Sequence, residues 1–263
     1  MAIQGINNNM PQLQTAQKDL QMWIKELGSG KKSFQTTSPA TLMIGQRLLN
    51  NAAGTSMANM NVNFANSRSQ TVESYLGNAS DVTSRLKELS VQAANGMLTD
   101  NDREAINAEA QELLEHMDET FRNANFNGQK ILQGGSESVA VSSDGSSLEI
   151  HNGDLSRATL GLEGFDLSTQ EGANAALEAA DGAIDALGSQ RAQIGSDIRI
   201  LDERFDANMD YEAALREAGS RQVDVDYAFG ATQQASASIQ AQVATAVSAQ
   251  GNQLAGSMIS GLV

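Results

Sequence analysis

Apolar side chains recur at helical spacing near the N-terminus, and they predict the first helix of the chain. Successive members are separated by four, three, seven, four and three positions, with the polar Gln17 interrupting the series. This spacing places them along one face of a helix. The residues are Ile6, Met10, Leu13, Leu20, Ile24 and Leu27. We expect Gly28 and Gly30 to end the helix, and the polar residues 31–39 are typical of a linker.

Two further helices are predicted before residue 127. The first begins near Ala40, is weakly periodic up to residue 70, and then follows a clean heptad pattern. Its core positions are Val72, Tyr75, Ala79, Val82, Leu86, Leu89 and Ala93. Asn95 and Gly96 break it, and Thr99 with the acidic residues that follow provides the cap of the next helix. That helix has Ile106, Ala110, Leu113, Met117 and Phe121 on one face.

Residues 133–172 differ in character, because short alternating apolar runs lie between Gly, Asp and Asn turns. Val139 and Val141 form one run, and Leu148 and Ile150 form the other. Together they predict one small β-hairpin. A tight turn is also expected just before this segment, at the Asn-Gly pair of residues 127–128.

The second half of the chain predicts two more helices. One extends from Gly172 to about Gly219, a length of roughly 70 Å. Its seam consists of Leu177, Ala180, Ile184, Leu187, Ile194, Ile198, Leu201, Phe205 and Leu215. The last segment, residues 223–263, carries another apolar stripe. That stripe consists of Ile239, Val243, Val247, Leu254, Met258 and either Ile259 or Leu262.

This order of elements predicts a mainly α fold, an elongated antiparallel coiled-coil or helical-bundle rod with a small β-hairpin element. Pairing the N- and C-terminal helices is the economical way to bury both terminal stripes. We therefore expect residues 1–41 to pair with 223–263, residues 42–132 to pair with 173–222, and residues 133–172 to form the hairpin insert. Terminal helices this polar are marginal in a monomer, so we expect other copies of the chain to bury and order them.

Composition and charge exclude several classes of function. The net charge of −15 disfavours nucleic-acid partners and anionic membrane surfaces. The absence of cysteine rules out disulfides and thiolate sites. The N-terminus has no basic region followed by an apolar run, and nowhere do about 18 apolar residues follow one another, so we expect neither a cleaved signal peptide nor membrane insertion.

No arrangement of residues indicates catalysis or a bound cofactor. His116 and His151 are the only histidines, and neither belongs to a zinc or triad motif. Residues 100–104 resemble the start of a calcium loop but lack its glycine, so they fit a helix cap better. We expect no enzyme activity, no metal and no cofactor.

Several runs resemble motifs of the bacterial flagellin family, in the family's order and spacing. The clearest are SRLKELSVQAAN at residues 84–95 and FNGQKIL at residues 126–132. Shorter matches lie at residues 3–9, 27–31, 217–221, 224–228 and 249–254. The chain departs from the family pattern at residues 37–41. It also has only residues 133–172 where many flagellins carry large outer domains.

The resemblance implies a structural subunit that polymerises into the bacterial flagellar filament for swimming motility. The terminal helices would line the channel of an extracellular filament, and the two terminal stripes would form the subunit interface. Subunits would pass unfolded through a type III export apparatus and would meet the flagellar cap and the hook–filament junction proteins. An export chaperone would cover the C-terminal segment, whose stripe at Val243, Val247, Leu254 and Met258 is exposed before assembly.

Some flagellins are recognised by a Toll-like receptor, and the family's recognition residues correspond here to Arg85, Leu89 and Glu109. Arg85 and Leu89 are four positions apart and share a helix face. The alternative is structural, because the heptad places Leu89 in the core and Arg85 and Glu109 fit ordinary surface or inter-subunit contacts.

Two other functions fit the same pattern of helices. A hook–filament junction protein shares the terminal helices, and a secreted coiled-coil binding module is the alternative from another class. The completeness of the motifs at residues 84–95 and 126–132 favours the filament subunit.

Overall fold

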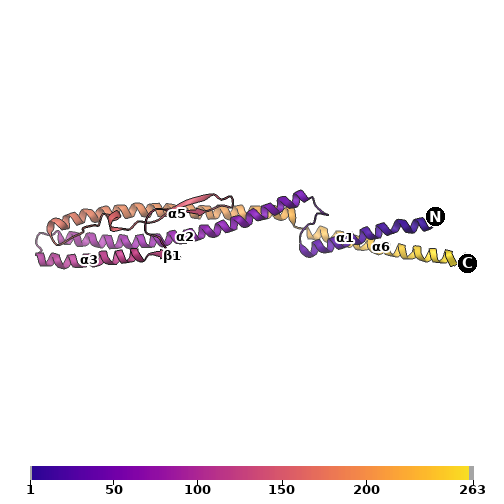
Figure 1. The fold of residues 1–263 in the computed structure, drawn as a ribbon, viewed down its shortest axis with the longest axis horizontal. Helices are drawn as coiled ribbons and strands as arrows, with labels where there is room; N and C mark the ends of the chain where they lie inside the picture. Colours follow the sequence, from indigo (N-terminus) through magenta and orange to yellow (C-terminus); the bar gives the residue numbers. More distant parts are fainter. Residues whose placement is uncertain (1, 261–263) are drawn as a thin grey trace. The chain divides into compact units, whose positions relative to one another are not determined.

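A computed structural model describes the backbone of residues 2–260 and the side chains of residues 11–251, 253–254 and 257. Six helices and two pairs of short strands make up this part of the chain (Figure 1). They are α1 Ala2–Ser29, α2 Pro39–Ala93, α3 Asp100–Asn123, β1 Asn125–Phe126, β2 Gln129–Lys130, β3 Ser136–Ala140, β4 Ser147–His151, α4 Arg157–Leu160, α5 Gln170–Val223 and α6 Tyr227–Ser260. The predicted helical fold with a small β element is confirmed.

The chain divides into two compact units. We call residues 1–52 and 213–263 the terminal unit, and residues 53–212 the inner unit. In the described part of the chain, no helix is apolar over a length that would span a membrane.

The core of the inner unit follows the predicted heptads. All seven predicted positions of α2, from Val72 to Ala93, are buried or packed against the core. Of the predicted α5 seam up to Ile198, the cluster and the residues packed on it include Ala180, Leu187, Ile194 and Ile198. Leu177 and Ile184 are only half-buried and lie outside that cluster. Burying a Leu or Val side chain stabilises a fold by about 1.5–3 kcal/mol, so this cluster holds α2, α3 and α5 together. In α3 the predicted Ala110 is fully buried, but so is Leu114, whereas the predicted Leu113 lies half-buried beside the core.

Two hairpins interrupt the helices. In the first, β1 pairs with β2 through a turn in which Asn127 and Gly128 both have positive φ, 50° and 80°. Such a turn matches the twist of the strands and requires residues of this type. In the second, β3 pairs antiparallel with β4, which confirms the hairpin predicted within residues 133–172. Its buried residues Val141 and Ile150 pack with Val62, Ala65 and Leu201 of the long helices.

The loop between α2 and α3 is held by one buried arginine. Arg103 donates hydrogen bonds to the carbonyl oxygens of Ala93, Asn95 and Leu98 at 3.0–3.1 Å. Thr99 and Asp102 form a reciprocal capping box at the start of α3. The interpretation of residues 100–104 as a helix cap is confirmed, and Arg103 adds a link that ties the cap to the end of α2.

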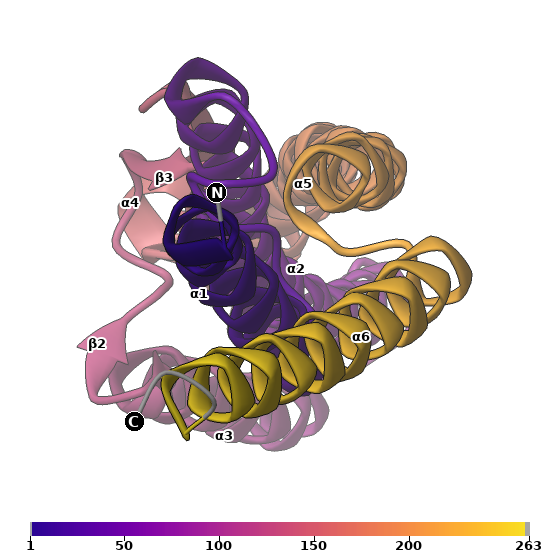
Figure 2. The same cartoon turned by 90° about the vertical axis from the view of Figure 1, so that its right-hand side faces the viewer.

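In the terminal unit, α1 and α6 lie side by side, which confirms the predicted pairing of the N- and C-terminal helices (Figures 1 and 2). The start of α2 and the end of α5 belong to the same unit. They meet at Gly45 and Gly219, where there is no space for a side chain.

Candidate assembly interface

The contact between α1 and α6 is made largely by small side chains. Ala16 of α1 and Ala237 of α6 are each 5% exposed. Along α6 the buried or half-buried positions continue at a spacing of four, three and four residues, through Ala241, Ala244 and Ser248. Small side chains at this spacing allow two helix backbones to approach closely. This alanine seam is the face that α6 turns toward its partner helix.

Larger groups close the contact at one end of the helix pair. Trp23 and Phe229 meet edge to face, with ring centroids 6.0 Å apart. A Cβ atom at Gly230 would lie 2.8 Å from Leu27 Cδ2, so a glycine is required for this approach.

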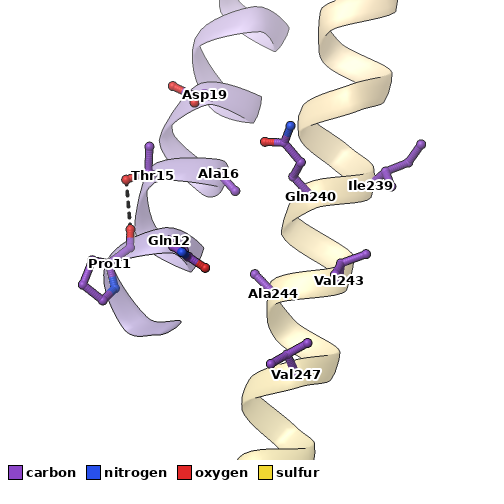
Figure 3. Close-up of a pocket in the computed structure, with 10 residues that line it drawn as sticks. All are labelled: Pro11, Gln12, Thr15, Ala16, Asp19, Ile239, Gln240, Val243, Ala244 and Val247. Carbon is purple, nitrogen blue, oxygen red and sulfur yellow. Dashed lines mark hydrogen bonds between the residues drawn. The ribbon is translucent and has the colours of Figure 1, made fainter. Parts of the chain in front are cut away.

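The large apolar side chains of α6 lie outside this seam. Ile239 is 61% exposed, Val243 56%, Val247 44% and Leu254 57%. Figure 3 shows Ala16 pointing toward α6, whereas Ile239 and Val243 point away from α1. The expectation that pairing buries both stripes is therefore wrong for α6. The reason is that its alanine seam and its aliphatic stripe occupy different faces of the helix.

The predicted interface residues of α1 differ in exposure. Leu13, Leu20 and Leu27 are half-buried, and Ile24 is 51% exposed. The side chains of Ile6, Met10, Met258, Ile259 and Leu262 lie outside the described residues. A groove of about 590 Å³ runs along both helices (Figure 3). It is lined by Pro11, Gln12, Thr15, Ala16, Asp19, Ile239, Gln240, Val243, Ala244 and Val247.

The two chain segments that leave the helix pair are joined to each other. Lys32 N donates to Val223 O at 2.7 Å, and Val225 N donates to Gly30 O at 3.0 Å. Lys31 Nζ lies 2.5 Å from Asp224 Oδ1, and this hydrogen bond lowers the pKa of Asp224 below its ordinary value. The linker predicted at residues 31–39 is thus tied at its start to the segment before α6.

A buried carboxylate fixes the rest of this linker. Glu26 is 2% exposed, and its Oε1 accepts hydrogen bonds from Ser33 N at 2.7 Å and Thr36 Oγ1 at 2.6 Å. Sequence reasoning missed Glu26, because a single acid in a polar helix gives no sign that the chain folds back over it.

The three predicted receptor residues lie together in the inner unit, but they are not equally accessible. Arg85 Nη2 lies 2.8 Å from Glu109 Oε1, and the hydrogen bond with Glu109 raises the pKa of Arg85. Arg85 also pairs with Glu88 at 3.0 Å. Leu89 is 1% exposed and belongs to the core. The structure therefore presents an exposed ion pair over a buried leucine.

Neither histidine belongs to a metal cluster among the residues that the structure describes. His116 lies on α3 and is exposed. His151 Nδ1 lies 2.9 Å from Asp197 Oδ2, and the same carboxylate oxygen accepts a hydrogen bond from His151 N at 2.8 Å. This pair fastens the end of β4 to α5.

Comparison with known families gives two matches that together cover most of the chain. The model of the bacterial flagellin N-terminal helical region matches residues 4–137. The model of the bacterial flagellin C-terminal helical region matches residues 177–262. The β3–β4 hairpin falls largely in the interval between them.

Individual relatives agree with these matches. A flagellin of Treponema pallidum is 30% identical, with 90% of each chain covered. A flagellar filament 33 kDa core protein of Treponema phagedenis is 29% identical over 97% of this chain and 98% of its own. A phase 1 flagellin of Salmonella naestved is 33% identical, but the alignment covers 63% of this chain and only 34% of the relative.

Two solved structures share the fold. The crystal structure of Bacillus cereus flagellin superposes with a TM-score of 0.52 at 23% identity, over 57% of this chain and 88% of its own. A chain described as a flagellar hook-associated protein of Vibrio parahaemolyticus has a TM-score of 0.62 at 16% identity, over 72% of this chain and all of its own.

Proposed function

As a member of the bacterial flagellin family, this chain is a structural subunit of the flagellar filament, and we propose that its paired terminal helices form the contacts through which copies polymerise. The observation that carries the proposal is the outward stripe of α6. Ile239, Val243, Val247 and Leu254 stay exposed although α1 already packs on the same helix. A partner that buries one such side chain gains about 1.5–3 kcal/mol.

In this arrangement the five predicted segments have distinct roles. Residues 1–41 and 223–263 form the filament core, and residues 42–132 and 173–222 form a layer around it. Residues 133–172, with the β3–β4 hairpin, lie on the outside of that layer. The short interval between the two family matches supports an outer surface without a large additional domain.

Shortening two apolar side chains of α6 tests the interface. Val243 and Val247 are changed together to Ala, which favours a helix more than Val does. Weaker polymerisation must then come from the lost apolar contact and not from a weaker helix. Thr245→Ala is the matched control, because it exchanges another β-branched exposed residue of α6 that lies outside the stripe. We expect the double variant to need a higher protein concentration to form filaments, and the control to behave as wild type. Equal behaviour of the two would contradict the interface.

The same stripe supports a second partner before assembly, an export chaperone that binds the C-terminal segment. An apolar helix face of this kind fits a groove on a partner protein. Co-purification of the chain with its export chaperone, with and without the Val243 and Val247 substitutions, tests this. Undiminished binding by the double variant would contradict it.

The filament role also implies where the chain works. We propose an extracellular filament whose ends contact the flagellar cap and the hook–filament junction proteins. Protease treatment of intact cells, followed by detection of the chain, tests the location, because a subunit outside the cell is degraded and one inside is protected.

Recognition by a Toll-like receptor would involve the exposed ion pair of the inner unit. In this proposal Arg85 and Glu109 meet the receptor, and Leu89 supports Arg85 from the core. Receptor activation by monomeric Arg85→Ala is compared with that by Lys87→Ala, which removes a neighbouring half-exposed cation from the same helix. A selective loss with Arg85→Ala is expected, and undiminished signalling would overturn the proposal.

A further inference from the structure

Met97 projects from the loop between α2 and α3, and its side chain is 92% exposed, the highest value among the large apolar side chains that the structure describes. Methionine is usually buried, and a single exposed one is unremarkable by itself. Here, however, the loop that carries it is fixed, and an apolar group on a fixed support is typical of the residues that dominate protein interfaces.

Three sets of hydrogen bonds fix this loop. Arg103 reaches carbonyl groups on both sides of Met97, those of Asn95 and Leu98. Met97 N itself donates to Asn95 Oδ1 at 3.0 Å. The capping box of Thr99 follows directly, and its hydrogen bonds lower the pKa of Asp102. A loop held in this way loses little conformational entropy when a partner covers it.

The segment that carries Met97 is itself uncharged, and the nearest charged groups, Arg103 and the exposed Asp100, lie at the start of α3. Residues 89–99 contain no acidic or basic residue, in a chain whose net charge is −15. Val91, within this segment, is 55% exposed. Acidic surfaces of two copies repel each other, so a segment without acidic side chains lowers the cost of bringing two copies together.

A groove with a complementary lining lies between α2 and α3 of the same unit. Its volume is about 390 Å³, and Ala79, Val82, Met117 and Phe121 provide its apolar part. Polar residues form the rest of its lining, namely Asn78, Asp81, His116 and Thr120. A flexible thioether fills irregular grooves well, and its sulfur gains from contact with an aromatic ring such as that of Phe121.

We propose that Met97 of one copy inserts into this groove of a neighbouring copy in the filament. The inference rests on the filament function and names a contact made by the inner unit. Along α2 the groove and the loop are separated by 14 positions, from Ala79 to Ala93, about 21 Å at 1.5 Å per residue. The two partners are thus different surfaces of one unit. Such a contact repeats from copy to copy and builds an open helical polymer unless the rotation between copies closes a ring, whereas a self-complementary contact closes a dimer.

Substitution of Met97 gives the first test. Met97→Glu places a charge in the groove, whereas Met97→Leu keeps an apolar side chain of similar size. The control is Met209→Glu, which adds the same charge at an exposed methionine of α5 in the same unit. We expect Met97→Glu to raise the concentration needed for filament growth roughly tenfold, and Met97→Leu and Met209→Glu to change it little. If Met97→Glu forms filaments of normal length at the concentration that the wild type needs, the proposed contact is overturned.

Crosslinking gives the second test. Because the native chain has no cysteine, only the introduced thiols can react with the reagent. A chain with both Asn78→Cys and Met97→Cys is assembled and treated with a short bismaleimide. Within one copy the two thiols are too far apart for a short reagent, so linkage between copies produces a ladder of multimers. A mixture of the two single variants yields dimers only, and replacing Asn78→Cys by Asn63→Cys, at another exposed position of α2, yields no ladder.

Microscopy of the wild-type chain separates the two ways in which the account can fail. Filaments without a ladder from the Asn78 and Met97 pair overturn the docking of Met97 and leave the filament function intact. A wild-type chain that forms no filaments overturns the filament function and this contact together.

Discussion

Gly45 and Gly219 lie so close that neither position has room for a methyl group. A Cβ atom at Gly45 would lie 2.3 Å from Val223 Cγ2 and 3.3 Å from the carbonyl oxygen of Gly219. A Cβ atom at Gly219 would lie 2.8 Å from Leu49 Cγ and 3.2 Å from the carbonyl oxygen of Gly45. The two glycines thus set how closely α2 and α5 approach in the terminal unit.

Gly45→Ala is expected to destabilise the terminal unit. An alanine in a helix normally stabilises it by about 0.5–1 kcal/mol relative to glycine. Here the added methyl group forces the helices apart, and overpacking of this kind costs about 1–3 kcal/mol. Hydrogen exchange of the α2 and α5 amides near residues 45 and 219 measures the effect. Gly77→Ala is the control, since nothing lies within 4 Å of the place that its methyl group would occupy, and it is expected to stabilise. Slower exchange in Gly45→Ala would contradict the prediction.

Arg103→Lys is expected to destabilise the inner unit by about 1–3 kcal/mol. Lysine keeps the charge but cannot reach three carbonyl groups in the geometry of the guanidinium fork, so buried acceptors lose their donors. Thermal unfolding followed by circular dichroism measures the change. Arg85→Lys is the matched control, because Arg85 is half-exposed and surface ion pairs contribute little. Equal melting temperatures for the two variants would show that the Arg103 fork is dispensable.

Acid is expected to weaken the joint between residues 31 and 224. The pKa of Asp224 is lowered in the folded chain by the hydrogen bond from Lys31. Asp224 therefore contributes stability that is fully present above the ordinary aspartate pKa of about 3.9, and that is lost as the pH falls through the lower folded-state value. Both side chains are substantially exposed, so the contribution is at most about 1 kcal/mol. Melting curves between pH 6 and pH 2 should show a smaller acid loss for Asp224→Asn than for wild type. Identical pH profiles would contradict this cause.

Much of this fold could be predicted from the sequence, because large apolar residues at heptad spacing leave few alternatives. The α2 seam from Val72 to Ala93 lies in the core as expected. The β3–β4 hairpin forms where alternation and turn residues predicted it. The helix expected from Gly172 to about Gly219 extends from Gln170 to Val223.

The features that sequence reasoning missed depend on small or single residues. The α6 seam of Ala237, Ala241 and Ala244 carries no large side chains, so the aliphatic stripe beside it gave the stronger signal. The Gly45–Gly219 approach joins positions 174 residues apart, and periodicity holds no information about such a pair. Arg103 gave one weak sign, since a cation in the first turn of a helix is unfavourable unless the rest of the fold uses it.

The most direct measurement of the central claim is electron microscopy of seeded polymerisation, with the full chain beside a variant that lacks residues 1–41. Removing α1 and the linker leaves α6 without its partner helix and the filament without one half of its proposed core. The account predicts long filaments from the full chain and none from the truncated chain. Filaments of normal form from the truncated chain, or a full chain that stays monomeric in the presence of seeds, would contradict it.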